Sequence, residues 1–336
     1  SELAVPEAVV ERLLAVQAQD PRGARLAVRA RLAGIDRAAS GAEGLVGASA
    51  IDRALDDGSL VVGWLNRGTL HLVRSGDYRW LAELTTPGLL TSNRTRLGQE
   101  GVSPGQADRG VKLICRQLED GPATRGELKA TLESDGIPVD GQAMVHILFL
   151  ASLEGKILRG PMAGREQAFV LVDDWLDKPE PIEPEQALAR LARRFLAGHG
   201  PASDRDLAKW AGIPLGKARK GFEAIAGELA GHGELVDLAG RQDPGKAKAP
   251  VRLLGAFDPI LHGWSSRGWI IPAEADRAVV TSNGIFRPTI LTGNRIHGTW
   301  SMPRGKVELA PFKQMASGLR KKLDVESEKV RAFLDA

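Results

Sequence analysis

The 336-residue chain is predicted to be a helix-rich α+β protein in which one unit of helices and a hairpin recurs before a small C-terminal β-sheet or partial barrel. Two observations predict this fold. A leading helix, a helix-turn-helix and two short strands recur about three times, with little identity between copies. After Gly240 the pattern changes to short β runs. We expect three tandem winged-helix units at 1–100, 101–180 and 181–250, and a β region at 251–336.

The composition is typical of an ordinary globular protein, with 43% apolar and 26% charged residues. No apolar stretch reaches the roughly 20 residues that cross a bilayer. The first residues also lack the basic and apolar regions of a secretory signal. The single cysteine, Cys115, lies in an apolar run and is interpreted as a structural thiol. We therefore expect a cytoplasmic protein.

The first unit is predicted to begin with an amphipathic helix from Pro6 to Gln19. Pro21 disfavours helical geometry at Asp20, so this helix is expected to end at about Gln19. The other predicted elements are a helix at 49–57, a strand at 59–65, a turn at 66–68 and a strand at 69–73. Helices followed by a hairpin are the order of a winged helix.

The second unit contains a capping box, in which Thr124 begins a short helix and Glu127 follows three residues later. Longer helices are predicted at 105–118 and 141–154, strands at 156–159 and 168–172, and a linker at 173–184.

The third unit has the clearest helix-turn-helix. A helix at 185–199 is followed by a second helix that Ser203 caps, with Asp206 placed to complete the cap. The turn is predicted at 212–214 and the recognition helix at 215–227. This helix carries Lys217, Arg219 and Lys220 near its start, where such helices usually meet DNA.

The C-terminal region is predicted to contain short strands at 251–254, 278–281, 285–287, 289–291 and 296–300. Tight-turn dipeptides, Asn283-Gly284 and Gly293-Asn294, separate them. A helix within 311–336 closes the chain.

The net charge of +3 is only mildly basic, so the clustering of charge matters more. Four basic clusters occur: Arg22, Arg25, Arg29 and Arg31; Arg190, Arg193 and Arg194; Lys217, Arg219 and Lys220; and Arg241, Lys246 and Lys248. Any one cluster could be a solvated helix face. Several in succession favour contacts with phosphate groups.

Common catalytic motifs are absent: the chain has no zinc spacing, Walker A sequence, dinucleotide fingerprint or Gly-x-Ser-x-Gly. His71 and His297 fall within β runs and are interpreted as structural. The element that remains is Gln17-Ala18-Gln19. In an extended segment, side chains two residues apart share a face, so both carboxamides could converge on one small object. Solvated caps at a helix end are the alternative.

Four segments carry a resemblance to a known family. They are Gln17-Ala18-Gln19, Arg67-Gly68-Thr69-Leu70-His71-Leu72, Leu254-Gly255-Ala256-Phe257-Asp258-Pro259 and Gly293-Asn294-Arg295-Ile296-His297-Gly298-Thr299-Trp300. In these motifs and their order the chain resembles the winged-helix family of the azinomycin-resistance DNA glycosylase AlkZ, over nearly its whole length. It has Gln-x-Gln where a sister branch has Gln-x-Asp, which places it nearer the AlkZ-like branch.

The resemblance implies a concave basic surface on duplex DNA and a monofunctional glycosylase acting on bulky N7-alkylpurines or interstrand crosslinks, with Gln17 and Gln19 as catalytic residues. An N7-alkylated purine is already cationic and leaves without a strong general acid, so carboxamides need only orient a water molecule. No cofactor and no metal are expected. Asp20 either supplies negative charge beside the sugar cation or is a turn residue before proline.

The expected partner is duplex DNA that carries alkylated purines or crosslinks. The residues predicted to bind it are Arg22, Lys217, Arg219, Lys220, Phe286 and Arg287. The last two flank the Asn283-Gly284 turn, which is interpreted either as a hairpin that enters the minor groove or as a plain structural hairpin.

A non-enzymatic winged-helix transcriptional regulator is the competing hypothesis. Such regulators usually dimerise to read a palindrome. The sequence shows no coiled-coil segment or apolar dimer stripe, which favours an enzyme that is a monomer. A structural role in a repair assembly is a third hypothesis, and no sequence feature supports it.

Overall fold

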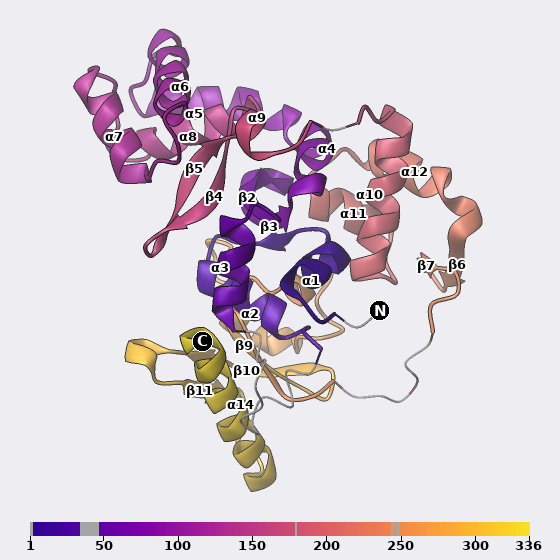
Figure 1. Ribbon diagram of the computed structural model, residues 1–336. Helices are drawn as coiled ribbons and strands as arrows, with labels where there is room; N and C mark the ends of the chain where they lie inside the picture. Colours follow the sequence, from indigo (N-terminus) through magenta and orange to yellow (C-terminus); the bar gives the residue numbers. More distant parts are fainter. Residues whose placement is uncertain (1–2, 34–46, 179, 243–244, 246–248) are drawn as a thin grey trace.

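A computed structural model describes residues 3–33, 47–178, 180–242, 245 and 249–336. The fold is helix-rich α+β with small antiparallel sheets. The first helices and strands lie at the centre, with residues 90–153 on one side, 184–224 on another, and 289–335 below (Figure 1). Among the described residues, no helix combines the length and apolar character needed to span a bilayer.

The first helix is shorter than the sequence predicted. α1 (Pro6–Leu13) ends six residues before Gln19, because Leu14 turns the chain with a φ of 66°. The chain then forms the short strand β1 (Val16–Gln17). A helix that the sequence did not predict, α2 (Pro21–Arg29), begins directly after the Gln-x-Gln segment.

The predicted helix and hairpin of the first unit are confirmed within one or two residues. They are α3 (Ala48–Asp56), β2 (Leu60–Leu65), the turn η2 (Asn66–Gly68) and β3 (Thr69–Arg74). Two further helices follow that the sequence did not predict, α4 (Ser75–Thr85) and α5 (Leu90–Gln99).

One five-stranded antiparallel sheet joins the first two predicted units, in the order β1-β3-β2-β4-β5. The second hairpin consists of β4 (Ile157–Ala163) and β5 (Glu166–Leu171), and β4 pairs with β2 through Arg159 and Val62. The helices of this region are α6 (Pro104–Leu118), α7 (Arg125–Ser134), α8 (Ala143–Leu153) and α9 (Val172–Trp175). The predicted capping box of Thr124 and Glu127 is present at the start of α7.

The third region also follows the prediction closely. Its elements are α10 (Pro184–His199), α11 (Asp204–Ala211), α12 (Leu215–Ala224), β6 (Leu229–His232) and β7 (Leu235–Leu238). Ser203 and Asp206 form the predicted cap of α11. Gly212 ends α11 with a φ of 70°, and a Cβ there would lie 2.9 Å from the backbone nitrogen of Arg67. The helix-turn-helix therefore packs directly on the η2 turn of the first region.

The C-terminal region departs most from the prediction. Its sheet has the order β11-β10-β9-β8, with β8 (Arg252–Leu254), β9 (Thr289–Thr292), β10 (Arg295–Ser301) and the unpredicted β11 (Glu308–Pro311). The strand predicted at 278–281 is wrong, because α13 (Asp276–Val279) occupies its first half. The strand predicted at 285–287 is reduced to a single bridge between Val280 and Phe286. The last helix is α14 (Ser317–Asp335).

Two hydrophobic clusters tie the first region to others. One joins Val9, Leu26 and Ile51 to Leu253, Trp300 and Phe333 of the C-terminal region. The other joins Val61 and Tyr78 to Phe195 and Trp210 of the third region. Val16 of β1 and Leu26 of α2 belong to the first cluster, and Leu14 and Ala15, just before β1, belong to the second. Burial of apolar surface therefore anchors the start of the glutamine segment to both neighbouring regions.

Candidate active site

The two glutamine side chains meet on one face of an extended segment. Gln17 Nε2 donates a hydrogen bond to Gln19 Oε1 at 2.6 Å. Gln17 is 4% exposed, whereas Gln19 is exposed to solvent. The predicted convergence of both carboxamides is thus present, but on a strand and not at a helix end. Among the described residues, Gln17 Oε1 and Gln19 Nε2 have no protein partner, so both remain able to bind water.

His71 lies directly opposite Gln17 in the ladder of β1 and β3. The neighbouring pair is hydrogen-bonded, since Ala18 N donates to Leu70 O at 2.7 Å. Hydrogen-bonded and non-hydrogen-bonded pairs alternate in an antiparallel ladder, so Gln17 and His71 form a non-hydrogen-bonded pair. Side chains approach closest in such pairs. His71 was interpreted from the sequence as structural, and only the strand register reveals its place beside Gln17.

The imidazole of His71 is neutral in a defined tautomer. Its Nδ1 lies 2.9 Å from the carbonyl oxygen of Thr69, which can only accept, so Nδ1 carries the hydrogen. Burial lowers the pKa of His71 to about 3, with His262 and Arg67 contributing in the same direction and the Thr69 hydrogen bond opposing. Nε2 therefore presents a lone pair, and it has no protein partner within the described part of the chain.

Asp20 caps the helix that follows the glutamines. Its side chain accepts a hydrogen bond from Gly23 N at 2.8 Å, which satisfies one of the open N–H groups of α2. This contact agrees with the interpretation of Asp20 as a residue of local structure. Arg22 lies exposed in the first turn of α2 and makes no ion pair with any described residue.

The segment Leu254–Pro259 abuts the start of α2. A Cβ on Gly23 would lie 2.4 Å from Ala256 O, and one on Gly255 would lie 2.6 Å from Gly23 O. Only glycine allows the two backbones to come this close. Arg31 makes a two-pronged ion pair with the buried Asp258, at 2.7 and 3.0 Å. The C-terminal region thus holds α2 in place next to the glutamines.

The aromatic rings of Phe257, Phe286 and His262 pack together next to this contact. Phe257 has a φ of 56° and its ring lies 6.0 Å from that of Phe286. The rings of Phe286 and His262 are 5.4 Å apart. Burial lowers the pKa of His262 to about 4, and its Nε2 bonds the carbonyl of Phe257 at 2.8 Å. Phe286, which was predicted to flank an exposed hairpin tip, is half-buried against Phe257 and His262, and the exposed apolar residue of that turn is Ile285.

Two of the basic clusters are largely structural. Arg25, Arg29 and Arg31 pair with Asp52, Glu326 and Asp258. Arg190 and Arg194 pair with Asp77, and Arg193 pairs with Glu228. Each of these arginines already has a carboxylate partner that is distant in sequence, which reduces the charge that the two clusters have available for phosphate groups.

In the two other basic clusters, some residues have protein partners and others are exposed without one among the described residues. Arg219 pairs with Asp204 at 2.9 Å, while Lys217 and Lys220 are exposed on α12 without an ion pair to a described residue. Arg241 bonds the last carbonyls of α10. Lys246 and Lys248 lie outside the described residues. Arg287 is exposed, and it donates to the carbonyl of Ala278.

The hairpin of β10 and β11 is a basic feature that was not predicted. Its tip is the turn η7 (Pro303–Gly305), where Arg304 has a φ of 51°. Arg304 and Lys306 are both exposed there. The Pro-Arg-Gly sequence between two β runs could have indicated this turn.

No three His, Cys, Asp or Glu side chains of the described residues gather closely enough to hold a metal ion. The groups that Gln17, Gln19 and His71 present on the accessible face are neutral hydrogen-bonding ones: two carboxamides and one imidazole lone pair. Such groups can orient a water molecule but cannot take its proton at neutral pH.

Comparisons with known proteins give one consistent result. The profile of the family described as "DNA glycosylase AlkZ-like" matches residues 10–333. The chain is 29% identical over 332 residues to "Interstrand DNA cross-link repair glycosylase" from Streptomyces sahachiroi, with 90% of this chain and 84% of that protein covered. The solved structure of the Streptomyces sahachiroi DNA glycosylase AlkZ superposes with a TM-score of 0.75 at 25% identity, over 99% of this chain and 92% of that one.

The family profile covers almost the whole chain, including both glutamines, and the solved structure matches the whole fold. This favours an enzyme acting on N-glycosyl bonds over the non-enzymatic regulator. The chain belongs to the AlkZ-like family of DNA glycosylases.

Proposed function

We propose that this glycosylase hydrolyses the N-glycosidic bond of bulky or cationic N7-alkylated purines in duplex DNA, and that interstrand crosslinks are among its substrates. The observation that carries the proposal is the contact of Gln17 with Gln19, which leaves polar atoms of both amides open to water. The name of the Streptomyces sahachiroi relative, a cross-link repair glycosylase, supports the inclusion of crosslinks.

In this mechanism the carboxamides hold a water molecule below C1′ of the target nucleotide. The water oxygen forms a bond to C1′ while the C1′–N9 bond breaks, and the bonding pair neutralises the positive charge of the alkylpurine. The extra proton on the water passes to solvent. The enzyme supplies position and not proton transfer, which is sufficient because the leaving group is already activated.

His71 acts as a third member of this site. Its Nε2 lone pair accepts a hydrogen bond from the same water, because the imidazole is neutral and lies on the face of β3 that meets Gln17. Two acceptors and one donor can then fix both hydrogens and a lone pair of the water. The function of His71 is to position the water. Its low pKa keeps Nε2 unprotonated at neutral pH, so this nitrogen remains a hydrogen-bond acceptor.

Substrate binding rests on the predicted organisation into three tandem winged helices at 1–100, 101–180 and 181–250, with a β region at 251–336, which together form a concave surface on DNA. Arg22, beside the glutamines, and Lys217, Arg219 and Lys220, at the start of α12, contact backbone phosphates. Arg287, with the exposed Ile285 and the half-buried Phe286 beside it, faces the minor groove at the turn of residues 281–285. The enzyme acts in the cytoplasm as a monomer.

The test is an excision assay on three duplexes: one with N7-methylguanine, one with a bulky N7 adduct and one with a crosslink between N7 atoms. Abasic sites are revealed by alkaline cleavage, and unhooking by the mobility of denatured strands. We expect excision from the first two duplexes and separation of the third. A protein that binds these duplexes and cleaves none of them would overturn the proposed substrate class.

A further inference from the structure

Arg67 is a cation close to the glutamine site that no step of the proposed reaction uses. It lies in the turn η2, between β2 and β3, and its side chain is exposed to solvent. Among the residues that the structure describes, no carboxylate pairs with this arginine and no oxygen accepts a hydrogen bond from its guanidinium. A guanidinium has five N–H donors and stays charged at neutral pH. These donors are therefore available to an acceptor from outside the protein.

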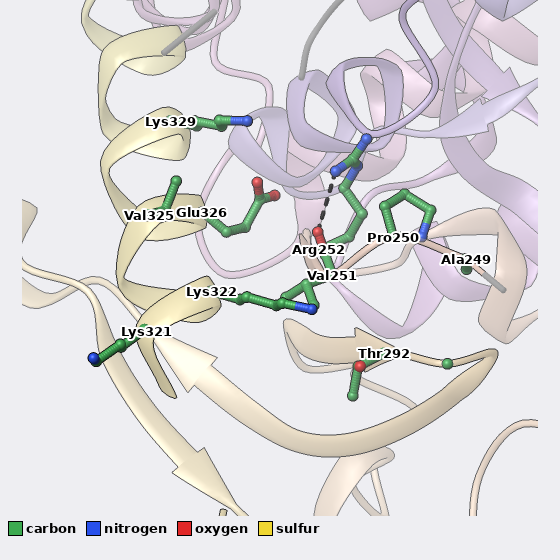
Figure 2. Close-up of a pocket in the computed structure, with 11 residues that line it drawn as sticks. Ala249, Pro250, Val251, Arg252, Thr292, Lys321, Lys322, Val325, Glu326 and Lys329 are labelled. Atoms are coloured by element: carbon green, nitrogen blue, oxygen red, sulfur yellow. Dashed lines mark hydrogen bonds between the residues drawn. The ribbon is translucent and has the colours of Figure 1, made fainter. Parts of the chain in front are cut away.

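The arginines that follow the glutamine segment show the opposite arrangement. Arg29 pairs with Glu326 at 2.7 Å, and both side chains are buried. Figure 2 shows this glutamate extending from α14 toward Arg252. Arg25 and Arg31 likewise pair with carboxylates of other elements. These three arginines join parts of the fold, and the arginine of η2 has no such role.

The strand register places Arg67 near the exposed glutamine. Gln17 lies opposite His71 in the antiparallel pair of β1 and β3, and the backbone pairing continues for one more residue. The direction of β1 then carries Gln19 toward Thr69, the first residue of β3. Arg67 precedes Thr69 by two residues, which separates their Cα atoms by about 7 Å at most. The turn η2 thus adjoins the end of the sheet that holds Gln19.

The charge of Arg67 acts on the same site. Burial is the main cause of the low pKa values of His71 and His262, and the positive charge of Arg67 contributes to both in the same direction. The interaction between two charges weakens with distance, so this effect requires a guanidinium that lies near both rings. Since His71 is the partner of Gln17 in the ladder, Arg67 lies close to the water-binding groups.

The base of the Arg67 side chain is held in one position. Its φ of 59° is in the left-handed region, and Thr69 Oγ1 closes the turn by donating to Asn66 O at 3.2 Å. A Cβ on Gly212 would lie 2.8 Å from Arg67 Cγ, so the stem of the arginine packs against the end of α11. The surrounding protein also removes part of the water from the guanidinium and lowers its pKa, although the side chain reaches solvent. A partly dehydrated cation attracts an anion more strongly than one in free water.

The proposed reaction favours an anion at this place. Positive charge develops on the sugar while the C1′–N9 bond breaks, and an unneutralised cation beside the glutamines would oppose it. A phosphate group next to the target nucleotide would neutralise the cation and arrives with every substrate. The planar fork of a guanidinium matches two oxygens of one phosphate group.

We propose that Arg67 binds a phosphate group that flanks the target nucleotide and thereby sets C1′ over the water held by Gln17 and Gln19. The assignment rests on the proposed function in taking a nucleotide of duplex DNA as the substrate. Arg67 touches the substrate but none of the atoms that react, so it contributes affinity and position.

The experiment measures binding to a duplex with a tetrahydrofuran abasic-site analogue, which gives the enzyme a defined target that it cannot cleave. The phosphates around the analogue are replaced, one linkage at a time, by uncharged methylphosphonate. At one flanking linkage the wild type should lose affinity about ten- to a hundredfold, the size of a lost hydrogen bond between charged groups. Arg67→Gln should lose as much on the unmodified duplex and almost nothing further at that linkage, because the two changes remove the same contact.

The matched control is Arg165→Gln. Arg165 is also exposed and without an ion pair to a described residue, in the turn between β4 and β5 of the same sheet. This variant should keep the wild-type loss at the flanking linkage. Thermal unfolding checks that each variant retains the fold. Arg67→Asn is a second uncharged variant, because asparagine adopts the left-handed region readily, and it should behave as Arg67→Gln does.

Two binding results would overturn the assignment. One is an equal loss at every linkage in the wild type and in Arg67→Gln and Arg67→Asn. The other is the absence of any loss at the linkages that flank the analogue in the wild type. A pH-dependent excision rate in Arg67→Gln, with unchanged methylphosphonate losses, would assign Arg67 to keeping His71 neutral and would also overturn it.

Excision of N7-methylguanine at saturating DNA is the separate readout. Arg67→Gln should be slower by about tenfold, because C1′ is no longer fixed over the water. A chain that shows the expected methylphosphonate losses but excises no N7-alkylpurine would leave the assignment of Arg67 standing and overturn the proposed function alone. Excision of N7-alkylpurines with equal methylphosphonate losses in wild type and Arg67→Gln would overturn the assignment of Arg67 alone.

Discussion

Gln17 and His71 face each other as a non-hydrogen-bonded pair across β1 and β3, so a carboxamide and a neutral imidazole lie side by side on one face of the sheet. The pairing follows from Leu14, whose positive φ ends α1 early and turns the chain into the strand. A longer helix would have removed Gln17 from the ladder. The strand register therefore places three hydrogen-bonding side chains together.

Replacing His71 tests its part in this arrangement. His71→Phe removes the Nε2 lone pair and should lower the excision rate at saturating DNA about tenfold to a hundredfold, the size expected when the water is no longer positioned. His71→Gln can place an amide oxygen near the same point and should recover part of the rate. A merely structural role would instead give rate decreases that follow the Tm of each variant.

The pH dependence provides a second test of His71. Its pKa of about 3 means that the imidazole stays neutral throughout the range from pH 5 to 8. The ratio of wild-type to His71→Gln excision rates should therefore be constant over this range. A ratio that changes with a midpoint near pH 6.5 would contradict the assignment of a neutral acceptor.

Many helices of the fold could be predicted from the sequence, but the pairings between residues that are distant in sequence could not. Capping residues such as Ser203 and Thr124 act within a few residues, so the helices that they begin were predicted correctly. The pairing of Gln17 with His71 depends on residues 54 positions apart, and no local pattern reports it. The same is true of Arg29 with Glu326, because charge clustering alone predicted a phosphate contact for this arginine.

Local sequence patterns also gave wrong secondary-structure predictions where tertiary packing determines the conformation of a segment. Residues 278–281 were predicted as a strand from their valines, yet Asp276 begins a helical turn that buries Val279 against Leu254 and Leu291. The segment from Arg22 to Arg29 was interpreted only as a basic cluster, although its alanines, leucine and valine form the buried face of α2. Short elements are decided by what they pack against.

Stability should fall in acid because of a buried histidine. Burial lowers the pKa of His199 to about 3, and neither ring nitrogen has a side-chain hydrogen bond among the described residues. Between about pH 6.5 and 3 the unfolded chain binds a proton that the folded chain does not, so the free energy of unfolding decreases as pH falls. The contribution is about 1.4 kcal/mol per pH unit.

His199→Phe isolates this contribution. The ring of His199 stacks on Phe195 at 5.0 Å, a place that phenylalanine can fill. Urea unfolding at pH 6, 5 and 4 should show a slope against pH that is shallower than wild type by about 1.4 kcal/mol per unit. The exposed His232→Phe is the control and should keep the wild-type slope. Parallel slopes for all three proteins would refute the linkage.

Gly23→Ala should destabilise the protein, against the usual effect of alanine in a helix. Alanine normally stabilises a helix by up to about 1 kcal/mol relative to glycine. Here its Cβ would lie 2.4 Å from Ala256 O, so backbone must move, at a cost of about 1–3 kcal/mol. Gly216→Ala in α12 meets no atom within 4 Å and should be neutral or stabilising. Thermal unfolding of the two variants tests this prediction, and equal Tm values would contradict the close approach of Gly23 to Ala256 O.

DNA binding by α12 should depend on its lysines more than on its arginine. With roughly six phosphate contacts the slope of log affinity against log salt is expected near −5. Replacing Lys217, Arg219 and Lys220 together by alanine should flatten it. Most of this change should appear in the Lys217→Ala, Lys220→Ala variant, because Arg219 is already paired with Asp204. If the slope of log affinity against log salt is unchanged in the triple variant, α12 does not contact the DNA backbone.

The decisive prediction concerns the two glutamines. Alanine at Gln17 or Gln19 should lower the excision rate about ten- to a thousandfold, because the water loses one of its positioning groups. DNA affinity should hardly change, since neither side chain is charged and phosphate contacts dominate binding. Stability should change by about 1 kcal/mol, the value of the hydrogen bond between them.

The double variant separates the catalytic role from a structural one. Both carboxamides act on one water, so the rate decrease in the double variant should be far smaller than the product of the two single decreases. A Gln17→Ala, Gln19→Ala protein that excises N7-methylguanine at the wild-type rate would refute the assignment of chemistry to this pair. Parallel loss of rate and binding would instead assign the pair to the structure of the β1–α2 junction. Loss of rate with binding retained is the result that the geometry of Gln17, Gln19 and His71 requires.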